Sequence, residues 1–218
     1  MSFQSIIFAV ILLASFINFG LNVRRLISYL NIGKPESRND NPSQRIKNVL
    51  AVAFGHTKLL REPLAGIMHF FIFWGFVILL LAILESIGEG LIPGFSFSFL
   101  GALYKPLVWL QDVIGVLVVV SIGIALYRRY ISKPKRLDVS GHAQFDATLI
   151  LLMILIIMLS MFAQNGLRIS LGMDAGNAAR MFSHLFSSLF TSVSDSGKEL
   201  WFSIFWWIHI GFVLGFMN

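Results

Sequence analysis

The chain has 218 residues, 56% of them hydrophobic, and its mean hydropathy is +0.78. An average soluble domain is only about 45–50% apolar, so this composition excludes an ordinary soluble protein and predicts an integral membrane protein. The sequence contains no cysteine, which excludes disulfides, thiolate metal sites and iron–sulfur clusters held by this chain. The net charge of +6 comes from basic residues beside apolar runs. It therefore indicates membrane orientation and not nucleic-acid binding.

The first apolar segment, 3–23, contains no charged residue. At 1.5 Å per residue it is long enough to cross a hydrocarbon core of about 30 Å. No basic residue precedes it, and it is longer than a signal-peptide core of about 7–15 residues, so we expect an uncleaved first span. The segment 24–62 follows as an inner loop rich in turn residues. Its part from 45 to 60 is predicted to be one helix lying at the inner membrane interface.

Four further apolar runs predict four more membrane-spanning helices, and they cover 64–84, 106–127, 147–167 and 200–217. The outer segment 173–196 has a short amphipathic pattern, which predicts a helix on the outer membrane surface. We therefore expect one all-α membrane domain, 1–218, that is a bundle of five transmembrane helices with interfacial helices.

The distribution of basic residues predicts the orientation of this bundle. Segments 24–61 and 128–136 hold 13 of the 17 Lys and Arg residues. The positive-inside rule places these two segments in the cytoplasm and the N-terminus outside.

Histidine is the strongest transition-metal ligand in this cysteine-free chain, and two histidines lie inside predicted spans. His69 lies about 9 Å and His209 about 16 Å from the inner edge of the membrane, counted at 1.5 Å per residue across a core of about 30 Å. We predict that they are the axial ligands of one haem b. Two histidine ligands leave no open position on the iron, so such a site carries single electrons. The alternative is that each histidine only bonds a neighbouring helix, as in a haem-free membrane anchor or transporter subunit.

The other three histidines lie nearer water. His56 precedes His69 by 13 residues, about 20 Å along a continuous helix unless Pro63 bends the path. It is either a ligand of a second, inner haem or a histidine at the solvated membrane edge. His142 lies at the same level and is either a partner of His56 or an interfacial residue. His184 falls on the polar face of the outer amphipathic pattern, so we expect a solvated surface residue.

Two carboxylates on the outer side are candidate proton acceptors for the oxidation of a quinol. Asp112 lies inside the third span and Glu85 closes the second. The alternative for both is a helix-end carboxylate in the headgroup region. On the inner side, Lys58 and Arg61 are placed either to meet the propionates of an inner haem or to anchor the helix at the membrane surface.

Four stretches together resemble a known family. They are Gly-His-Thr-Lys-Leu-Leu-Arg-Glu-Pro-Leu-Ala-Gly-Ile-Met-His at 55–69, Phe-Trp-Gly-Phe at 73–76, Leu-Gln-Asp at 110–112 and Trp-Trp-Ile-His at 206–209. The chain resembles the membrane domain of the respiratory nitrate reductase gamma subunit. It is most similar to the version at the N-terminus of membrane-bound, heterodisulfide-reductase-like iron–sulfur oxidoreductases and electron-transfer-flavoprotein:menaquinone oxidoreductases.

This resemblance implies a cytochrome b with one or two haems in the bacterial cytoplasmic (inner) membrane. It implies electron exchange between menaquinone and a cytoplasmic iron–sulfur domain or subunit, or an electron-transfer flavoprotein. Carried over by position, His69 and His209 would hold the haem nearer the outer face and His56 the inner haem, whereas the family's fourth histidine has no counterpart here. Relatives of this type continue into a cysteine-rich cluster domain. We therefore expect the sequence to be the membrane part of a longer protein, the alternative being a partner subunit that carries the clusters.

Overall fold

The structure is a computed structural model that describes residues 3–34, 36, 40–137, 141–173 and 176–218. Five helices are long and apolar enough to cross a membrane, and the described residues contain no strand. These helices are α1 (Phe3–Leu30), α3 (Pro63–Leu91), α4 (Tyr104–Tyr127), α5 (Gly141–Ser170) and α7 (Asp195–Phe216). The predicted all-α membrane bundle is confirmed, and each predicted span lies within one of these helices or ends one residue beyond it.

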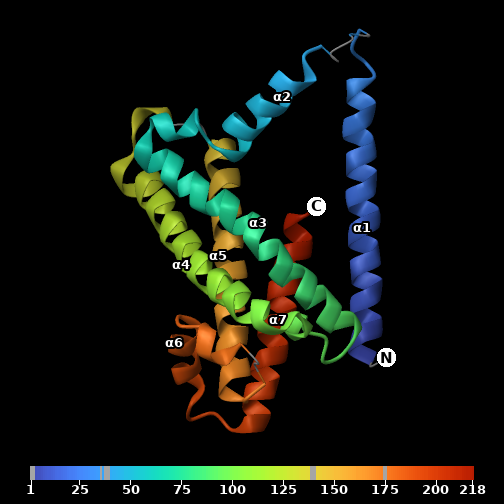
Figure 1. Cartoon of the computed structure of the whole chain (residues 1–218), viewed down its shortest axis with the longest axis vertical. Helices are drawn as coiled ribbons and strands as arrows, with labels where there is room; N and C mark the ends of the chain where they lie inside the picture. Colours follow the sequence, from blue (N-terminus) through green and yellow to red (C-terminus); the bar gives the residue numbers. More distant parts are fainter. Residues whose placement is uncertain (1–2, 35, 37–39, 138–140, 174–175) are drawn as a thin grey trace.

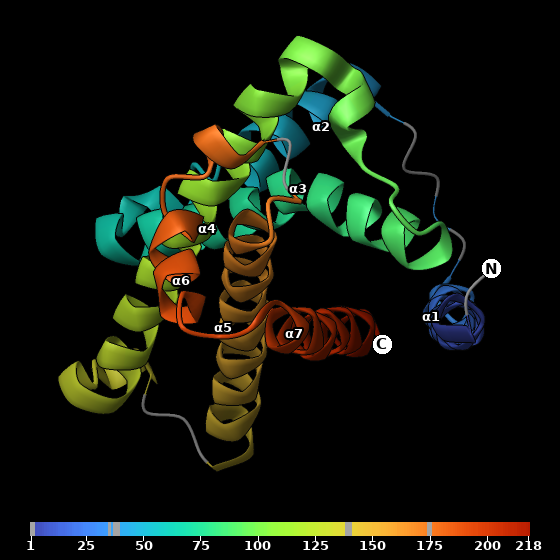
Figure 2. The same ribbon diagram turned by 90° about the horizontal axis from the view of Figure 1, so that it is seen from below.

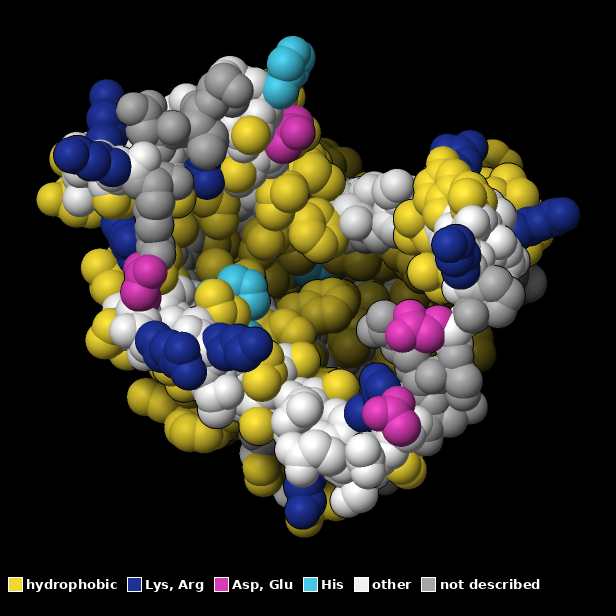
Figure 3. Space-filling model, turned by 90° about the horizontal axis from the view of Figure 1, so that it is seen from above, with side chains coloured by type: hydrophobic (Ala, Val, Ile, Leu, Met, Phe, Trp, Pro, Cys, Tyr) yellow, Lys and Arg dark blue, Asp and Glu magenta, His cyan; other side chains and the backbone are white. Residues whose placement is uncertain are grey.

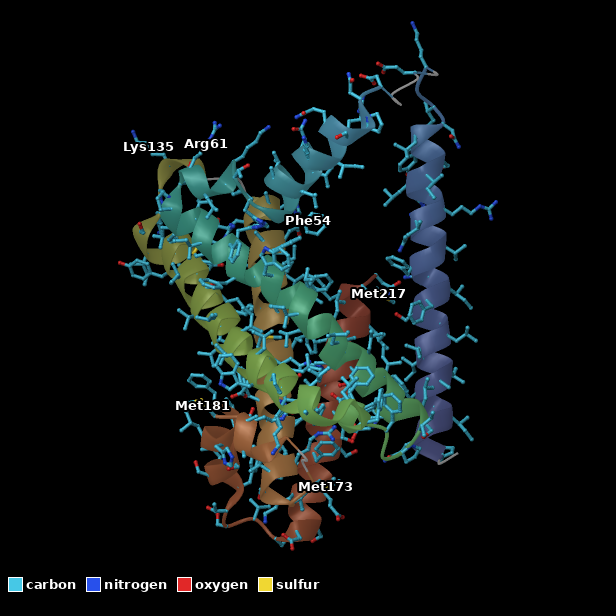
Figure 4. All side chains as sticks on the ribbon, viewed as in Figure 1. Phe54, Arg61, Lys135, Met173, Met181 and Met217 are labelled. Atoms are coloured by element: carbon cyan, nitrogen blue, oxygen red, sulfur yellow. The ribbon has the colours of Figure 1, made fainter. Side chains whose placement is uncertain are left out.

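Shorter helical elements connect the spans. They are α2 (Pro42–Asn48), η1 (Val49–Phe54), η2 (Leu59–Arg61), η3 (Phe97–Leu103), η4 (Arg128–Ser132), η5 (Lys135–Leu137), η6 (Asn177–Ala179), α6 (Ser183–Ser187) and η7 (Ser188–Phe190). Figure 4 shows Arg61 and Lys135 at one end of the molecule and Met173 and Met181 toward the other. The predicted inner and outer loops therefore lie at different ends of the bundle.

The helices exceed the predicted spans because they continue into the interfacial layers. The 29 residues of α3 extend about 43 Å at 1.5 Å per residue, which is longer than a hydrocarbon core of about 30 Å. A helix with such an excess of length can tilt in the bilayer. Figure 1 shows α3 and α4 running obliquely to the upright helix α1.

Four helices, α3, α4, α5 and α7, form the core of the bundle. Close approach of α3 and α4 depends on Gly75, where an added Cβ would lie 2.3 Å from Val118 Cγ2. Lipid tails are as apolar as leucine, so helices in a bilayer associate through such tight packing and not through burial from water. The buried core residues are Leu79, Ile114, Val118, Ile122, Ile157, Met158, Met161 and Phe162.

Helix α1 meets the other helices mainly through its outer half. Phe8 is fully buried, and its ring centroid lies 5.1 Å from that of Trp206 on α7. Toward its inner end α1 stands apart from the bundle (Figures 1 and 2). Figure 3 shows the resulting hollow at this end, with mainly hydrophobic walls and histidine side chains visible inside it.

The prediction of one continuous interfacial helix over 45–60 is wrong. The helix ends in a π-helical turn at Phe54, and the Gly55 N–H donates to the carbonyl of Leu50 at 2.7 Å. An added Cβ at Gly55 would lie only 2.7 Å from the Ala51 oxygen, so glycine permits this tight ending. The next residue, His56, has a φ of 53° in the left-handed region. The chain therefore turns sharply before α3 begins.

The absence of cysteine allows a direct test of orientation. We expect Ser196→Cys, at the exposed start of α7, to react with a membrane-impermeant maleimide in intact cells. Ser132→Cys, at the exposed end of η4, should react only after permeabilisation, because the positive-inside rule places its basic loop in the cytoplasm. The unsubstituted chain is the blank, and the opposite labelling pattern would contradict the orientation.

Candidate functional site

His56 and His69 form a pair at the inner end of α3. The Nε2 atom of His56 lies 3.1 Å from Nδ1 of His69, and the ring centroids are 5.1 Å apart. His56 is buried, with 1% of its surface exposed, whereas His69 is exposed. The expected separation of about 20 Å is wrong because the turn at Gly55 brings His56 back against α3. The two histidines therefore form one site and not two levels.

The main chain and aromatic side chains hold His56 in place. Its Nδ1 atom lies 3.0 Å from the carbonyl oxygen of Phe54, and the same oxygen accepts a hydrogen bond from Trp74 Nε1 at 3.1 Å. The rings of Phe70 and Phe73 pack against the imidazole, with centroids 5.8 Å and 4.8 Å away. Both rings belong to α3, so the second span supplies the aromatic surface against which His56 packs.

His209 is buried on α7 and is held by α5. Its Nδ1 atom lies 3.0 Å from the carbonyl oxygen of Ile157 and 3.2 Å from Ser160 Oγ. A carbonyl oxygen only accepts hydrogen bonds, so the neutral ring carries its proton on Nδ1 and leaves Nε2 unprotonated. His209 thus joins α5 to α7, whereas the His56–His69 pair joins the inner loop to α3.

A polar cavity of about 310 Å³ lies in the outer half of the bundle. His209 borders this cavity, together with polar side chains from α3, α4 and α5 and the following outer segment. The main ones are Glu85, Gln111, Gln164, Asn165 and Arg180. Polar groups at membrane depth are expensive, so such a cluster around a cavity is a candidate functional site.

Gln111 is the exception among the buried polar groups of this region. Only 2% of its surface is exposed, and its Nε2 atom has no hydrogen-bond acceptor within the described ranges. Leaving a buried donor unsatisfied costs about 1–3 kcal/mol. The geometry therefore favours a bound molecule or water with an acceptor oxygen at this point of the cavity.

Sequence reasoning missed most of the neutral polar residues of the cavity. Gln164 and Asn165 stand in the fourth apolar run, where a search for charged residues passes over amides. Their adjacent position near the outer end of α5 was the available signal.

The two candidate carboxylates have different surroundings. Glu85 borders the cavity, and its Oε1 atom accepts hydrogen bonds from Ser96 Oγ and Phe97 N at 2.7 Å each and from Tyr104 at 3.2 Å. It therefore also fixes the loop between α3 and α4.

Asp112 is buried against the outer segment. Its oxygens accept hydrogen bonds from Phe182 N at 2.6 Å, Ser183 N at 3.2 Å and Ser183 Oγ at 2.5 Å. These three donors occupy both carboxylate oxygens, which favours an anchoring role over proton exchange.

An ion pair between Glu89 and Arg168 stands beside the cavity and links α3 to α5. The Arg168 guanidinium lies 4.8 Å from the ring centroid of Phe202 on α7. Glu89 and Phe202 also border a second cavity of about 460 Å³, which Trp206 and Trp207 line together with residues of α1. The ion pair therefore lies between the two cavities.

The remaining candidates lie at the surface. His142 is exposed at the inner start of α5. The ring nitrogens of His56 contact the Phe54 carbonyl and His69, so His142 is not the partner of His56. His184 is exposed on α6, as the sequence predicted. Lys58 and Arg61 are exposed near the inner end of α3. In the described part of the chain, no three His, Cys, Asp or Glu side chains gather closely enough to hold a metal ion together.

Fold and site define an all-α, multi-pass membrane protein with two histidine sites and an outer polar cavity. No protein-family model and no solved structure matches the chain. The chain is 29% identical over 195 residues to the probable iron–sulfur-binding oxidoreductase FadF of Bacillus subtilis, covering 89% of this chain and 27% of that protein. It is 30% identical over 190 residues to the EtfAB:quinone oxidoreductase of Syntrophomonas wolfei, covering 83% of this chain and 26% of that protein.

The chain thus spans about a quarter of the length of these curated relatives. The expected similarity to iron–sulfur and electron-transfer-flavoprotein-linked oxidoreductases is confirmed. The likeness to the nitrate reductase gamma subunit stays a prediction.

The anchoring role of Asp112 predicts a measurable loss of stability in Asp112→Ala. The variant leaves the amides of the partly buried Phe182 and the buried Ser183 without their acceptor, at about 1–3 kcal/mol for each group. For a chain of this size we expect the detergent-solubilised protein to unfold at least about 4 °C lower. Asp146→Ala, which removes an exposed carboxylate from α5, is the control and should change little. Equal unfolding temperatures for both variants would contradict the role.

Proposed function

We propose that this chain is the haem b-binding membrane part of a quinone-linked oxidoreductase. It carries electrons between a quinone in the bilayer, such as menaquinone, and an iron–sulfur or flavoprotein partner in the cytoplasm. The names of the two relatives support the redox class, since one is described as iron–sulfur-binding and the other as an EtfAB:quinone oxidoreductase. The membrane is the bacterial cytoplasmic membrane.

The arrangement of His209 carries the haem proposal. A histidine that ligates a metal usually donates its other ring N–H to a carbonyl or carboxylate, which fixes the ring and makes the ligand more basic. His209 has this arrangement with Ile157 and leaves Nε2 for iron. His69 would be the second histidine to hold the haem iron, with its Nδ1 held by His56.

These residues fit the group, because two neutral imidazoles with engaged Nδ1 atoms on apolar helices are the donor set of a bis-histidine haem. When bound, haem supplies reversible one-electron exchange. The chain's own residues orient the two rings: Ile157 and Ser160 hold the buried His209, and His56 holds His69.

The outer cavity supports a site for the quinone head group. Its volume of about 310 Å³ lies at the lower end of the range for small-molecule pockets. The unsatisfied Nε2 of Gln111 donates to a quinone oxygen, and Glu85 on the cavity wall accepts a proton when a quinol is oxidised. The second cavity, with Trp206 and Trp207 in its wall, is the path by which a lipid-soluble molecule reaches Glu89 and the outer cavity.

The haem proposal is tested by a reduced-minus-oxidised visible spectrum and a pyridine haemochrome assay on detergent-purified protein. We expect a b-type α band in the wild type that His69→Ala and His209→Ala each abolish, because each variant removes one axial ligand. His142→Ala removes an exposed histidine and should keep the full haem content.

A folded, fully extracted wild-type protein without haem would contradict the electron-transfer proposal. The histidines would then serve only to join helices, as in a membrane anchor or transporter subunit.

The quinone site is tested by titration with a water-soluble naphthoquinone, followed through quenching of tryptophan fluorescence. Gln111→Leu should weaken binding about 2–10-fold, since one hydrogen bond contributes about 0.5–1.5 kcal/mol. Gln44→Leu makes the same change on the exposed helix α2 and should leave the affinity unchanged. Equal affinity in both variants would rule out Gln111 as a ligand of the quinone.

A further inference from the structure

The inner loop holds His56 in a backbone conformation that most residues avoid. The residue has a φ of 53°, in the left-handed region that side chains with a Cβ rarely adopt. It follows a π-helical turn and a glycine that tolerates no Cβ. Strained residues and π-turns persist where surrounding contacts stabilise them, and they are frequent at functional sites. The strained backbone at His56 brings the imidazole ring of His56 against that of His69.

The hydrogen bonds of His56 determine where its proton lies. The Phe54 carbonyl can only accept, so the Nδ1 atom of His56 must be the donor at 3.0 Å. In the neutral ring, Nε2 is then unprotonated and must be the acceptor in the 3.1 Å contact with His69. His69 consequently carries its proton on Nδ1, and its Nε2 atom is unprotonated.

We propose that His56 is a positioning residue for His69: it accepts the Nδ1 proton of His69 and so presents the unprotonated Nε2 of His69 as a metal ligand. The buried ring of His56 orients His69 in the way that the Ile157 carbonyl oxygen orients His209: each accepts an Nδ1 proton. The two intramembrane histidines thus have matching proton positions, although one is oriented by a main-chain oxygen and the other by a second imidazole.

The proposal replaces one of the two alternatives for His56, that it is a ligand of a second haem. Its Nδ1 is engaged by Phe54 and its Nε2 by His69, so neither nitrogen is available to iron while the pair is formed. Only the consequence for haem rests on the proposed function. The hydrogen bond itself can be measured with or without haem.

The hydrogen bond is tested by NMR of the full chain in detergent, with ¹⁵N-labelled histidine and with any haem reduced to its diamagnetic state. We expect a downfield His69 Nδ1 proton that shows a through-hydrogen-bond ¹⁵N–¹⁵N coupling to an unprotonated His56 Nε2. His56→Leu should remove the coupling and His142→Leu should keep it. A proton on His56 Nε2, or no shared proton in the wild type, would overturn the proposal.

The consequence for haem is tested by two variants of the same position. His56→Gln can still accept the Nδ1 proton through its amide oxygen, whereas His56→Leu cannot. A histidine ligand that donates this hydrogen bond is more basic and favours ferric iron. We therefore expect His56→Leu to retain haem with a raised midpoint potential, and His56→Gln to stay close to the wild type.

Loss of haem in both variants, as complete as in His69→Ala, would show that His56 is itself a ligand and overturn the proposal. An unchanged potential in His56→Leu would overturn it too. A wild type that shows the coupling but contains no haem would instead contradict the proposed function alone.

Discussion

A bilayer core contains no water to satisfy polar groups, so each buried polar side chain of this protein needs a partner within the chain or a ligand. Asp112 and His209 meet this demand by joining elements that are distant in the sequence, and His56 meets it by joining the inner loop to α3. These polar contacts set the arrangement of the helices where apolar packing alone would allow them to slide. Gln111, which has an unsatisfied donor, stands out against this pattern and points to the outer cavity as a ligand site.

The five spans could be predicted from the sequence because length and apolar composition alone decide whether a helix crosses a bilayer. The place of His56 could not, because it depends on two residues. Gly55 ends the helix, and the left-handed backbone at His56 reverses the direction of the chain, whereas counting along the sequence assumes one helical axis. Because of this single change of direction, His56 and His69 are in hydrogen-bond contact and not about 20 Å apart.

The candidate site was predicted in part, and the reasons differ by residue. His69 and His209 stand out because an imidazole is conspicuous in an apolar run. The partners of Asp112 lie 70 and 71 residues further along the chain, so no local pattern distinguishes an anchoring carboxylate from a proton acceptor. Neutral amides such as Gln164 give no charge signal, and only the folded bundle gathers them around one cavity.

The central claim is that two histidines of this chain hold one low-spin haem, with His69 and His209 as the pair. The most direct measurement is a quantitative electron paramagnetic resonance spectrum of the oxidised, purified protein beside its iron and chain concentrations. The account predicts a low-spin ferric signal of a bis-imidazole haem, at one spin per chain. A high-spin ferric signal, which indicates an open or non-histidine axial position, or the absence of any haem signal would contradict it.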